Sequence, residues 1–110
     1  SGNSFVHETE SQVILNGSRD ISFTMDLVLK DIGIFQEIAD RAKVPLEINP
    51  MMINIFKDGI QKYGSRELSP NIIRRLEDQT GLDIRAPGFP KEMKDDEPEE
   101  IGYEVKPKLI

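Results

Sequence analysis

The sequence predicts an all-α fold, a helical bundle built on one long central helix and followed by an extended acidic C-terminal tail. Three observations predict it. Apolar residues recur at helical spacing, proline and glycine stand at the ends of these periodic segments, and no segment alternates apolar and polar residues as a strand would. We expect a short helix within residues 5–17 and a helical domain over residues 1–81. The tail over residues 82–110 is expected to pack on this domain or on a neighbouring subunit through Phe89, Ile101, Tyr103 and Val105.

The central helix is predicted from about Phe23 to Lys43. Ser22 or Thr24 can accept a hydrogen bond from the first free backbone N–H groups and so cap its N-terminus. Pro45 is expected to end it, because proline disfavours helical geometry in the preceding residue. At 100° per residue one broad apolar face results, which comprises Leu27, Val28, Ile34, Phe35, Ile38, Ala39 and Ala42.

Two further helices are predicted from the residues at their ends. Each has a capping residue, a proline in its first turn and a terminal glycine, which are Asn49, Pro50 and Gly64 for the second helix and Ser69, Pro70 and Gly81 for the third. Gly59 lies in the middle of the second helix, where glycine costs stability, so we expect another helix to approach closely there. Arg74, Arg75, Glu77 and Asp78 of the third helix are expected to face water.

Composition excludes several classes of function. With 20 acidic and 14 basic residues the net charge is -6, which argues against nucleic-acid binding. No apolar run reaches the roughly 20 residues that a membrane span needs, and the N-terminus does not resemble a signal peptide. The chain has no cysteine, so a cytoplasmic location is expected. We expect no metal site, and the single histidine, His7, is expected to be exposed.

Asp31 is the unusual residue of the central helix. Helical spacing places this carboxylate inside the apolar face, where a charge is costly unless it is paired or hydrogen-bonded. Lys30 lies at the edge of the same face, close in angle to Phe23. One interpretation is a local salt bridge beside a core phenylalanine. The other is that this face closes over a cleft, in which Lys30 reaches an anionic or carbonyl group.

The run Phe23-Thr-Met-Asp-Leu-Val-Leu-Lys30-Asp31-Ile-Gly-Ile resembles the signature that opens the main C-terminal helix of β-hydroxyacid dehydrogenases, the family of 3-hydroxyisobutyrate dehydrogenase. The resemblance continues through Ala39…Ala42-Lys-Val-Pro45-Leu, Phe56…Gly59…Tyr63-Gly64 and Glu67-Leu68-Ser69. Val44 and Leu46 depart from the family pattern, which has a glycine before the proline and commonly a second proline after it. The resemblance covers about two-thirds of the chain, from Ser18 to Gly81, and its order and spacing are more specific than any one motif.

The resemblance implies a two-domain enzyme whose cleft lies between an N-terminal Rossmann domain and this helical C-terminal domain. Lys30 would then approach the nicotinamide of NAD or NADP, and Phe23 and Asp31 would shape the pocket for a small hydroxy acid or aldehyde. The catalytic lysine and the glycine-rich nucleotide turn of the family have no counterpart in these residues, so the chain alone should be inactive. The family also implies a homodimer or larger assembly, and the choice between NAD and NADP belongs to the Rossmann domain.

A second class of function explains the helices and the charge equally well. A non-catalytic helical module for oligomerisation or protein interaction would also have amphipathic helices and an acidic surface. It does not explain an acid inside an apolar face next to a lysine. In such a module Asp31 should be exposed or locally paired, whereas the dehydrogenase interpretation predicts an open face that carries Phe23, Lys30 and Asp31 together.

Overall fold

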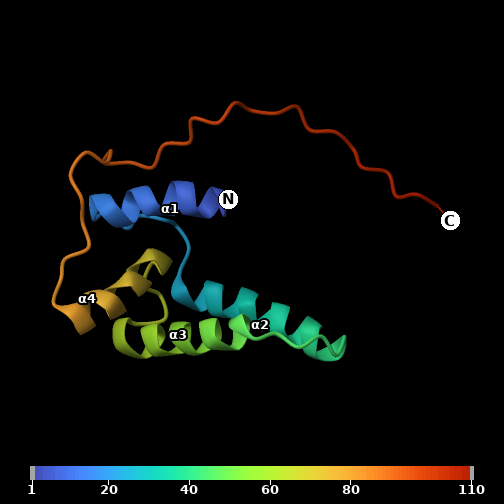
Figure 1. The fold of residues 1–110 in the computed structure, drawn as a ribbon, viewed down its shortest axis with the longest axis horizontal. Helices are drawn as coiled ribbons and strands as arrows, with labels where there is room; N and C mark the ends of the chain where they lie inside the picture. The colour runs from blue at the N-terminus through green and yellow to red at the C-terminus, as the bar shows by residue number, and fades with distance from the viewer. Residues whose placement is uncertain (1, 110) are drawn as a thin grey trace.

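The computed structural model describes residues 2–109 and contains four α-helices and one 3-10 helix (Figure 1). In chain order these are α1 (Phe5–Asn16), α2 (Met25–Arg41), α3 (Ile48–Tyr63), the 3-10 helix η1 (Ser69–Ile73) and α4 (Arg74–Thr80). Residues 2–109 form no strand, and the only ladder contact among them is an isolated antiparallel bridge between Thr24 and Leu68. The predicted all-α class is therefore confirmed.

The core lies where α2, α3 and η1 meet, and it extends to α1, whose Val13 is fully buried. Met25 at the start of α2 is fully buried, and Ala39 near its other end is buried as well. Phe56 is the buried aromatic residue of α3, and Pro70 of η1 is also fully buried. The helices α2 and α3 run side by side (Figure 1) and form the most extensive contact between any two elements of the described chain.

Gly59 permits a close approach to α3, as its position in the sequence predicts. A Cβ atom at this position would lie 2.5 Å from Cδ1 of Ile72 and 3.2 Å from Sδ of Met25. The neighbours come from η1 and α2 rather than from one partner helix. The absent side chain thus lets three elements meet at one point.

The structure corrects the predicted caps of all three main helices. Thr24 occupies the N-cap position of α2, but its hydroxyl donates to a carboxylate oxygen of Asp26 instead of accepting a backbone N–H. Helix α3 begins at Ile48, so Asn49 lies inside it and its amide donates to the Ile32 carbonyl and to Gln36 Oε1, both at 3.0 Å. Ser69 is the buried first residue of η1 and its side chain caps nothing. Of the proposed caps, Asn49 instead bonds to a neighbouring helix.

Helix α2 ends before the proline that was expected to end it. Lys43 adopts a left-handed conformation with φ of 56°, and the backbone N–H of Val44 donates to the Ala39 carbonyl at 2.9 Å. This is the hydrogen-bond pattern of a Schellman C-cap, which here uses a lysine in the position that glycine usually takes. Gly81 closes α4 in the predicted left-handed conformation, with φ of 69°.

The segment after α4 has no helix up to residue 109, and it first runs along α1. The N–H of Ala86 donates to the Leu15 carbonyl at 2.9 Å, and the Asn16 amide donates to the Pro90 carbonyl at 2.6 Å. The Gln12 amide forms a pair of hydrogen bonds with the backbone of Lys94, at 2.9 and 3.0 Å. Beyond that point the tail leaves the helices and extends away from them (Figure 1), which accounts for the longest dimension of 56 Å.

Candidate functional site

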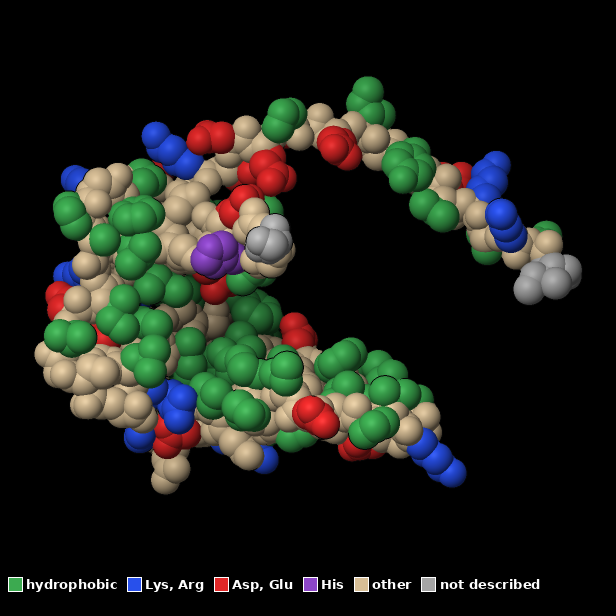
Figure 2. Space-filling view, viewed as in Figure 1, with side chains coloured by type: hydrophobic (Ala, Val, Ile, Leu, Met, Phe, Trp, Pro, Cys, Tyr) green, Lys and Arg blue, Asp and Glu red, His purple; other side chains and the backbone are tan. Residues whose placement is uncertain are grey.

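Helix α2 has two apolar faces, and only one of them is packed. Met25 and Ala39 face the core, whereas Ile34 and Ile38 on the other side are exposed to solvent. Figure 2 shows a hollow between α1 and α2, with hydrophobic side chains over the surface of α2. The broad apolar face predicted from the helical wheel therefore divides into a buried side and an open side.

Lys30 and Asp31 lie on the open side of α2 and contact each other. Their ion pair joins Nζ of Lys30 and Oδ1 of Asp31 at 3.2 Å, with side chains 58% and 55% exposed. At helical spacing Asp31 shares its face with Leu27, Ile34 and Ile38. The cost of a charge inside an apolar face does not arise here, because the apolar face around Asp31 is exposed and the carboxylate is paired with Lys30. In the chain as described, Asp31 is both exposed and locally paired.

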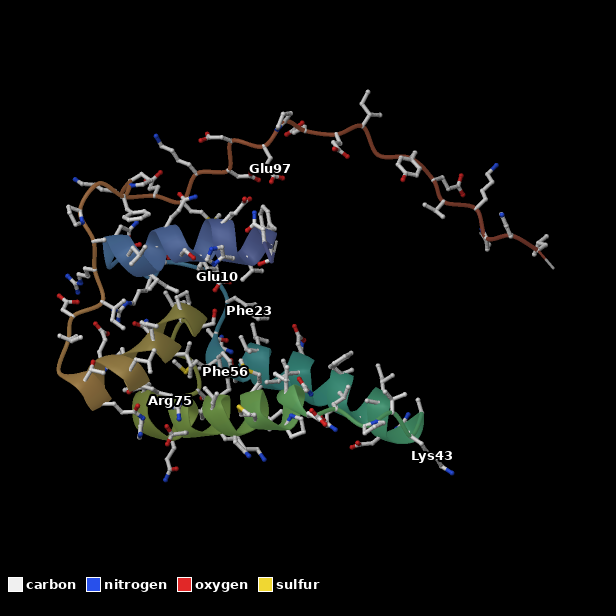
Figure 3. The ribbon with its side chains drawn as sticks, in the orientation of Figure 1. Glu10, Phe23, Lys43, Phe56, Arg75 and Glu97 are labelled. Carbon is white, nitrogen blue, oxygen red and sulfur yellow. The ribbon has the colours of Figure 1, made fainter. Side chains whose placement is uncertain are left out.

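Phe23 belongs to the loop before α2 and is half-buried. Its side chain projects into the hollow between α1 and α2 (Figure 3). Its backbone is fixed on both sides, since its N–H donates to the Ile21 carbonyl at 2.7 Å and its carbonyl accepts from the Ser69 N–H at 2.7 Å. The structure thus brings Lys30 and Asp31 together on α2 and places Phe23 in the loop before that helix.

A network of polar contacts fixes the N-terminus of α2. The Asp26 carboxylate accepts from the Thr24 hydroxyl and from the Leu27 backbone N–H, and it pairs with Arg66 at 3.2 Å. The Thr24 hydrogen bond and, to a lesser degree, the Arg66 contacts hold the pKa of Asp26 below its usual value. A carboxylate at a helix N-terminus is also favoured by the helix dipole. This network orients the first turn of the helix that carries Lys30.

An open apolar pocket at the turn between α2 and α3 was missed by the sequence analysis. It has a volume of about 530 Å³ and is lined by Phe35, Pro45, Leu46, Glu47, Ile48, Asn49 and Met52. Phe35 was assigned to the single apolar face, and the connection between the helices was read only as a break. The apolar pair Pro45-Leu46 between two helices is the signal that could have indicated it.

Three further observations concern the described residues. Among residues 2–109 no group of three or more histidine, aspartate or glutamate side chains is placed to hold a metal ion. No helix in the same range has both the length and the hydropathy that a membrane crossing requires. His7 lies exposed on α1, and its ring is 3.4 Å from the Ser11 hydroxyl.

These observations define an all-helical domain with a charged pair on an open apolar face. Residues 1–76 match the family model described as the NAD-binding domain of NADP-dependent 3-hydroxyisobutyrate dehydrogenase. Because the match spans well over half of the chain, the chain belongs to this family of oxidoreductases. The cofactor of the family is NAD or NADP.

A curated relative agrees with this assignment. The 2-(hydroxymethyl)glutarate dehydrogenase of Eubacterium barkeri is 32% identical over 85 residues, which are 76% of this chain and 28% of that protein. The chain therefore spans little more than a quarter of the length of the relative it matches. No solved structure matches the chain.

Proposed function

We propose that residues 1–81 are the C-terminal helical domain of a two-domain NAD(P)-dependent β-hydroxyacid dehydrogenase, of the 3-hydroxyisobutyrate dehydrogenase type. The observation that carries this proposal is the family match over residues 1–76, and the exposed apolar face of α2, on which Lys30 and Asp31 stand, supports it. An exposed apolar face with a few polar groups on it is typical of a surface that forms one wall of a binding cleft. A second domain would supply the other wall.

Lys30 is proposed to bind the nicotinamide end of the cofactor. Its ammonium group carries three N–H donors and pairs only with Asp31 among the described residues, so it remains accessible to the carboxamide oxygen of a nicotinamide. The residues present fit this end of the cofactor alone, because the chain contains no glycine-rich turn for the pyrophosphate. When bound, the nicotinamide supplies the hydride chemistry, and the protein supplies binding and orientation.

Phe23 and Asp31 are proposed to shape the substrate pocket. Phe23 offers an apolar wall in the hollow between α1 and α2 (Figure 3), and Asp31 can accept a hydrogen bond from a substrate hydroxyl or hold Lys30 in place. We assign the substrate to the class of small hydroxy acids and their aldehydes. The similarity to the 2-(hydroxymethyl)glutarate dehydrogenase of Eubacterium barkeri supports that class. With no catalytic group proposed in residues 1–110, the chain alone should be inactive.

A non-catalytic helical module for oligomerisation or protein interaction is the second candidate. The observation that favours it is that Asp31 is exposed and paired with its own neighbour, which needs no substrate. The exposed apolar side chains of α2 would then serve a protein partner. The dehydrogenase family also supports a homodimer or larger assembly, and the absence of cysteine fits a cytoplasmic location.

The test uses the longer protein that carries this domain. Oxidation and reduction of NAD, NADP and their reduced forms would be followed with a panel of short β-hydroxy acids and semialdehydes. Lys30→Ala should lower kcat/KM at least about tenfold, because the exposed ammonium group is lost where binding needs it. Lys57→Ala, which removes another exposed lysine on α3, should leave turnover unchanged.

The outcomes separate the two candidates. Turnover that depends on Lys30 and not on Lys57 supports the dehydrogenase domain. A protein that binds neither cofactor and turns over none of the panel would leave the interaction module. The 110-residue chain on its own is expected to give no turnover with any substrate of the panel.

A further inference from the structure

Asn16 and Gly17 stand at the end of α1 and form the only Asn-Gly dipeptide in the sequence. An asparagine loses its amide when the backbone nitrogen of the next residue attacks the side-chain Cγ atom. Glycine favours this attack, because it has no Cβ atom to block the approach. Both residues are half-buried and therefore partly open to water. The other asparagines precede a serine, a proline or an isoleucine, which hinder the attack by their bulk or by a missing N–H; these are Asn3, Asn49, Asn54 and Asn71.

The fold holds the Asn16 side chain in an arrangement that assists this reaction. Its Oδ1 atom accepts the backbone N–H of Ser18 at 2.7 Å. The contact is an Asx-turn, which keeps the side-chain carbonyl close to the Gly17 peptide. When a nitrogen attacks this carbonyl, negative charge develops on Oδ1, and an N–H donor already directed at that oxygen stabilises the charge. The Ser18 N–H is such a donor.

The tail holds the nitrogen that would leave. Nδ2 of Asn16 donates to the Pro90 carbonyl at 2.6 Å and to the Lys91 carbonyl at 3.1 Å, where the tail passes the C-terminal end of α1 (Figure 1). Ammonia leaves only after this nitrogen gains a proton, and a carbonyl oxygen has no proton to give. The attacking nitrogen is restrained as well, since the Gly17 N–H donates to the Ile14 carbonyl at 3.2 Å. The bound tail is therefore expected to slow the loss of the amide.

Loss of the amide would in turn remove what holds the tail. A carboxylate has only acceptors, so it would face the carbonyl oxygens of Pro90 and Lys91 with no proton to share. It would also stand at the C-terminus of α1, where the helix dipole disfavours a negative charge and the last turn has no basic residue. Arg85 and Lys91 line the pocket beside Asn16, but both are exposed, and exposed ion pairs contribute little.

We propose that Asn16 is a deamidation site, which the bound tail protects and whose conversion releases the tail from α1. Hydroxide takes the proton of the Gly17 nitrogen, which bonds to Cγ of Asn16. The bond from Cγ to Nδ2 breaks, and the leaving nitrogen takes a proton from water, so that ammonia departs and hydroxide is regenerated. Water then opens the cyclic imide to aspartate or isoaspartate. The net reaction consumes one water and releases one ammonia, and it does not depend on the dehydrogenase assignment.

The site is tested by incubating the 110-residue chain in mildly alkaline buffer and locating deamidation by peptide mass spectrometry. In guanidinium chloride Asn16 should react faster than every other asparagine, and in the folded chain at least about tenfold more slowly than in the unfolded one. Gln12→Ala removes two hydrogen bonds to Lys94 and should raise the folded-state rate at least about threefold. Lys57→Ala on α3 is the control and should not change it.

Three results of this experiment would overturn the proposal. If Asn16 reacted no faster than the other asparagines in the unfolded chain, it would not be a deamidation site. Equal rates in the folded and unfolded chains would show that the fold gives no protection. Equal rates in the wild type and in Gln12→Ala would show that the tail does not provide it.

The release is tested with Asn16→Asp, and Asn16→Ala serves as the uncharged control. Both variants lack the two donated hydrogen bonds, and Asn16→Asp adds the charge that deamidation creates. Hydrogen exchange at the Lys94 amide should be at least about tenfold faster in Asn16→Asp than in the wild type, and faster than in Asn16→Ala. Circular dichroism checks that the helices remain folded. A Lys94 amide that exchanges in Asn16→Asp as slowly as in the wild type, or more slowly than in Asn16→Ala, would overturn the release.

Discussion

Arg19 and Glu77 form an ion pair of 2.7 Å whose side chains are only 8% and 16% exposed. The pair joins the loop between α1 and α2 to α4, two segments that are far apart in the sequence. Glu77 also accepts the backbone N–H of Ile84 at 3.0 Å, so one carboxylate connects the loop, α4 and the beginning of the tail. Arg19 adopts a left-handed backbone conformation with φ of 53°, and two of its guanidinium nitrogens, Nε and Nη2, have no partner.

Removing one member of this pair should destabilise the chain more than removing both. Arg19→Met leaves the Glu77 carboxylate without its cation, whereas Arg19→Met combined with Glu77→Gln leaves no unpaired charge. The double variant should recover at least about half of the loss in the urea midpoint. Urea unfolding followed by circular dichroism measures this. Additive losses from the two substitutions would show that the pair is not coupled.

Acid should weaken the fold through Glu77. The Arg19 hydrogen bond, followed by the Ile84 N–H, lowers the pKa of Glu77 from 4.5 to about 2. A lowered folded-state pKa stabilises the fold above pH 4.5, and that stabilisation is lost as the pH falls from 4.5 towards 2. The difference in unfolding free energy between wild type and Glu77→Gln should therefore be largest near pH 7 and shrink across this window.

The same pH series contains its own control. Hydrogen bonds from Thr24 and Arg75 also lower the pKa values of Asp26 and Asp58, respectively, so the wild type and Glu77→Gln should share that part of the acid sensitivity. Only the Glu77 contribution differs between the two chains. Parallel stability curves from pH 7 to pH 2 would contradict the assigned role of Glu77.

The two helical glycines should respond oppositely to alanine. At Gly33 in α2 an added Cβ meets nothing within 4 Å, so Gly33→Ala should stabilise the chain by about 0.5–1 kcal/mol through helix propensity. At Gly59 the Cβ would lie 2.5 Å from Ile72, and overpacking of about 1–3 kcal/mol exceeds that gain. Gly59→Ala should therefore destabilise by about 1 kcal/mol in thermal or urea unfolding.

Ile72→Val offers a check on this mechanism. It removes the Cδ1 atom that an alanine at position 59 would meet, so it should recover part of the loss in the Gly59→Ala background. If Gly59→Ala were as stable as Gly33→Ala, Ile72 and the rest of η1 would move away from the added Cβ without a cost in stability.

Gln12 should control the order of the tail without contributing much to the fold. Its amide makes two hydrogen bonds to the backbone of Lys94, and Gln12→Ala removes both. Hydrogen exchange at the Lys94 amide should speed up at least about tenfold, because its protein acceptor is gone. The midpoint of unfolding should stay within about 0.5 kcal/mol of wild type, as for most exposed substitutions. Unchanged exchange would mean that other contacts hold this stretch.

The sequence predicts the elements of this fold better than it predicts their ends. Gly81 ends its helix as expected because a left-handed glycine acts locally and needs no partner. Asn49 and Ser69 were assigned as caps on the same local grounds, but the Asn49 amide bonds to α2, and the Ser69 backbone N–H bonds to the Phe23 carbonyl while its side chain caps no helix. Such contacts depend on which elements pack together, and local spacing carries no information about that.

For the candidate site, too, the sequence predicts local features and misses those that depend on packing. Helical spacing placed Asp31 inside the apolar face of α2 and Lys30 at its edge, and the structure adds an ion pair between these two sequence neighbours. The helical wheel does not show that this apolar face is exposed, because the periodicity of apolar residues is the same for a packed face and for an exposed one. Likewise helical spacing placed Glu77 on the water-facing side of its helix. The structure pairs it with Arg19, which lies 58 residues earlier in the chain, and local spacing carries no information about so distant a partner.

The loop after α3 also has a consequence for ligand recognition. Met25 N–H donates to the Glu67 carbonyl at 2.9 Å, Asp26 N–H to the Ser65 carbonyl at 3.0 Å, and Ser69 N–H to the Phe23 carbonyl at 2.7 Å. These hydrogen bonds fix the backbone around Phe23 to residues 65–69, which do not belong to the proposed site. Under the proposed role of Phe23 in the substrate pocket, a change in the length or rigidity of this surface loop would alter substrate preference while every residue proposed to touch the substrate stays the same.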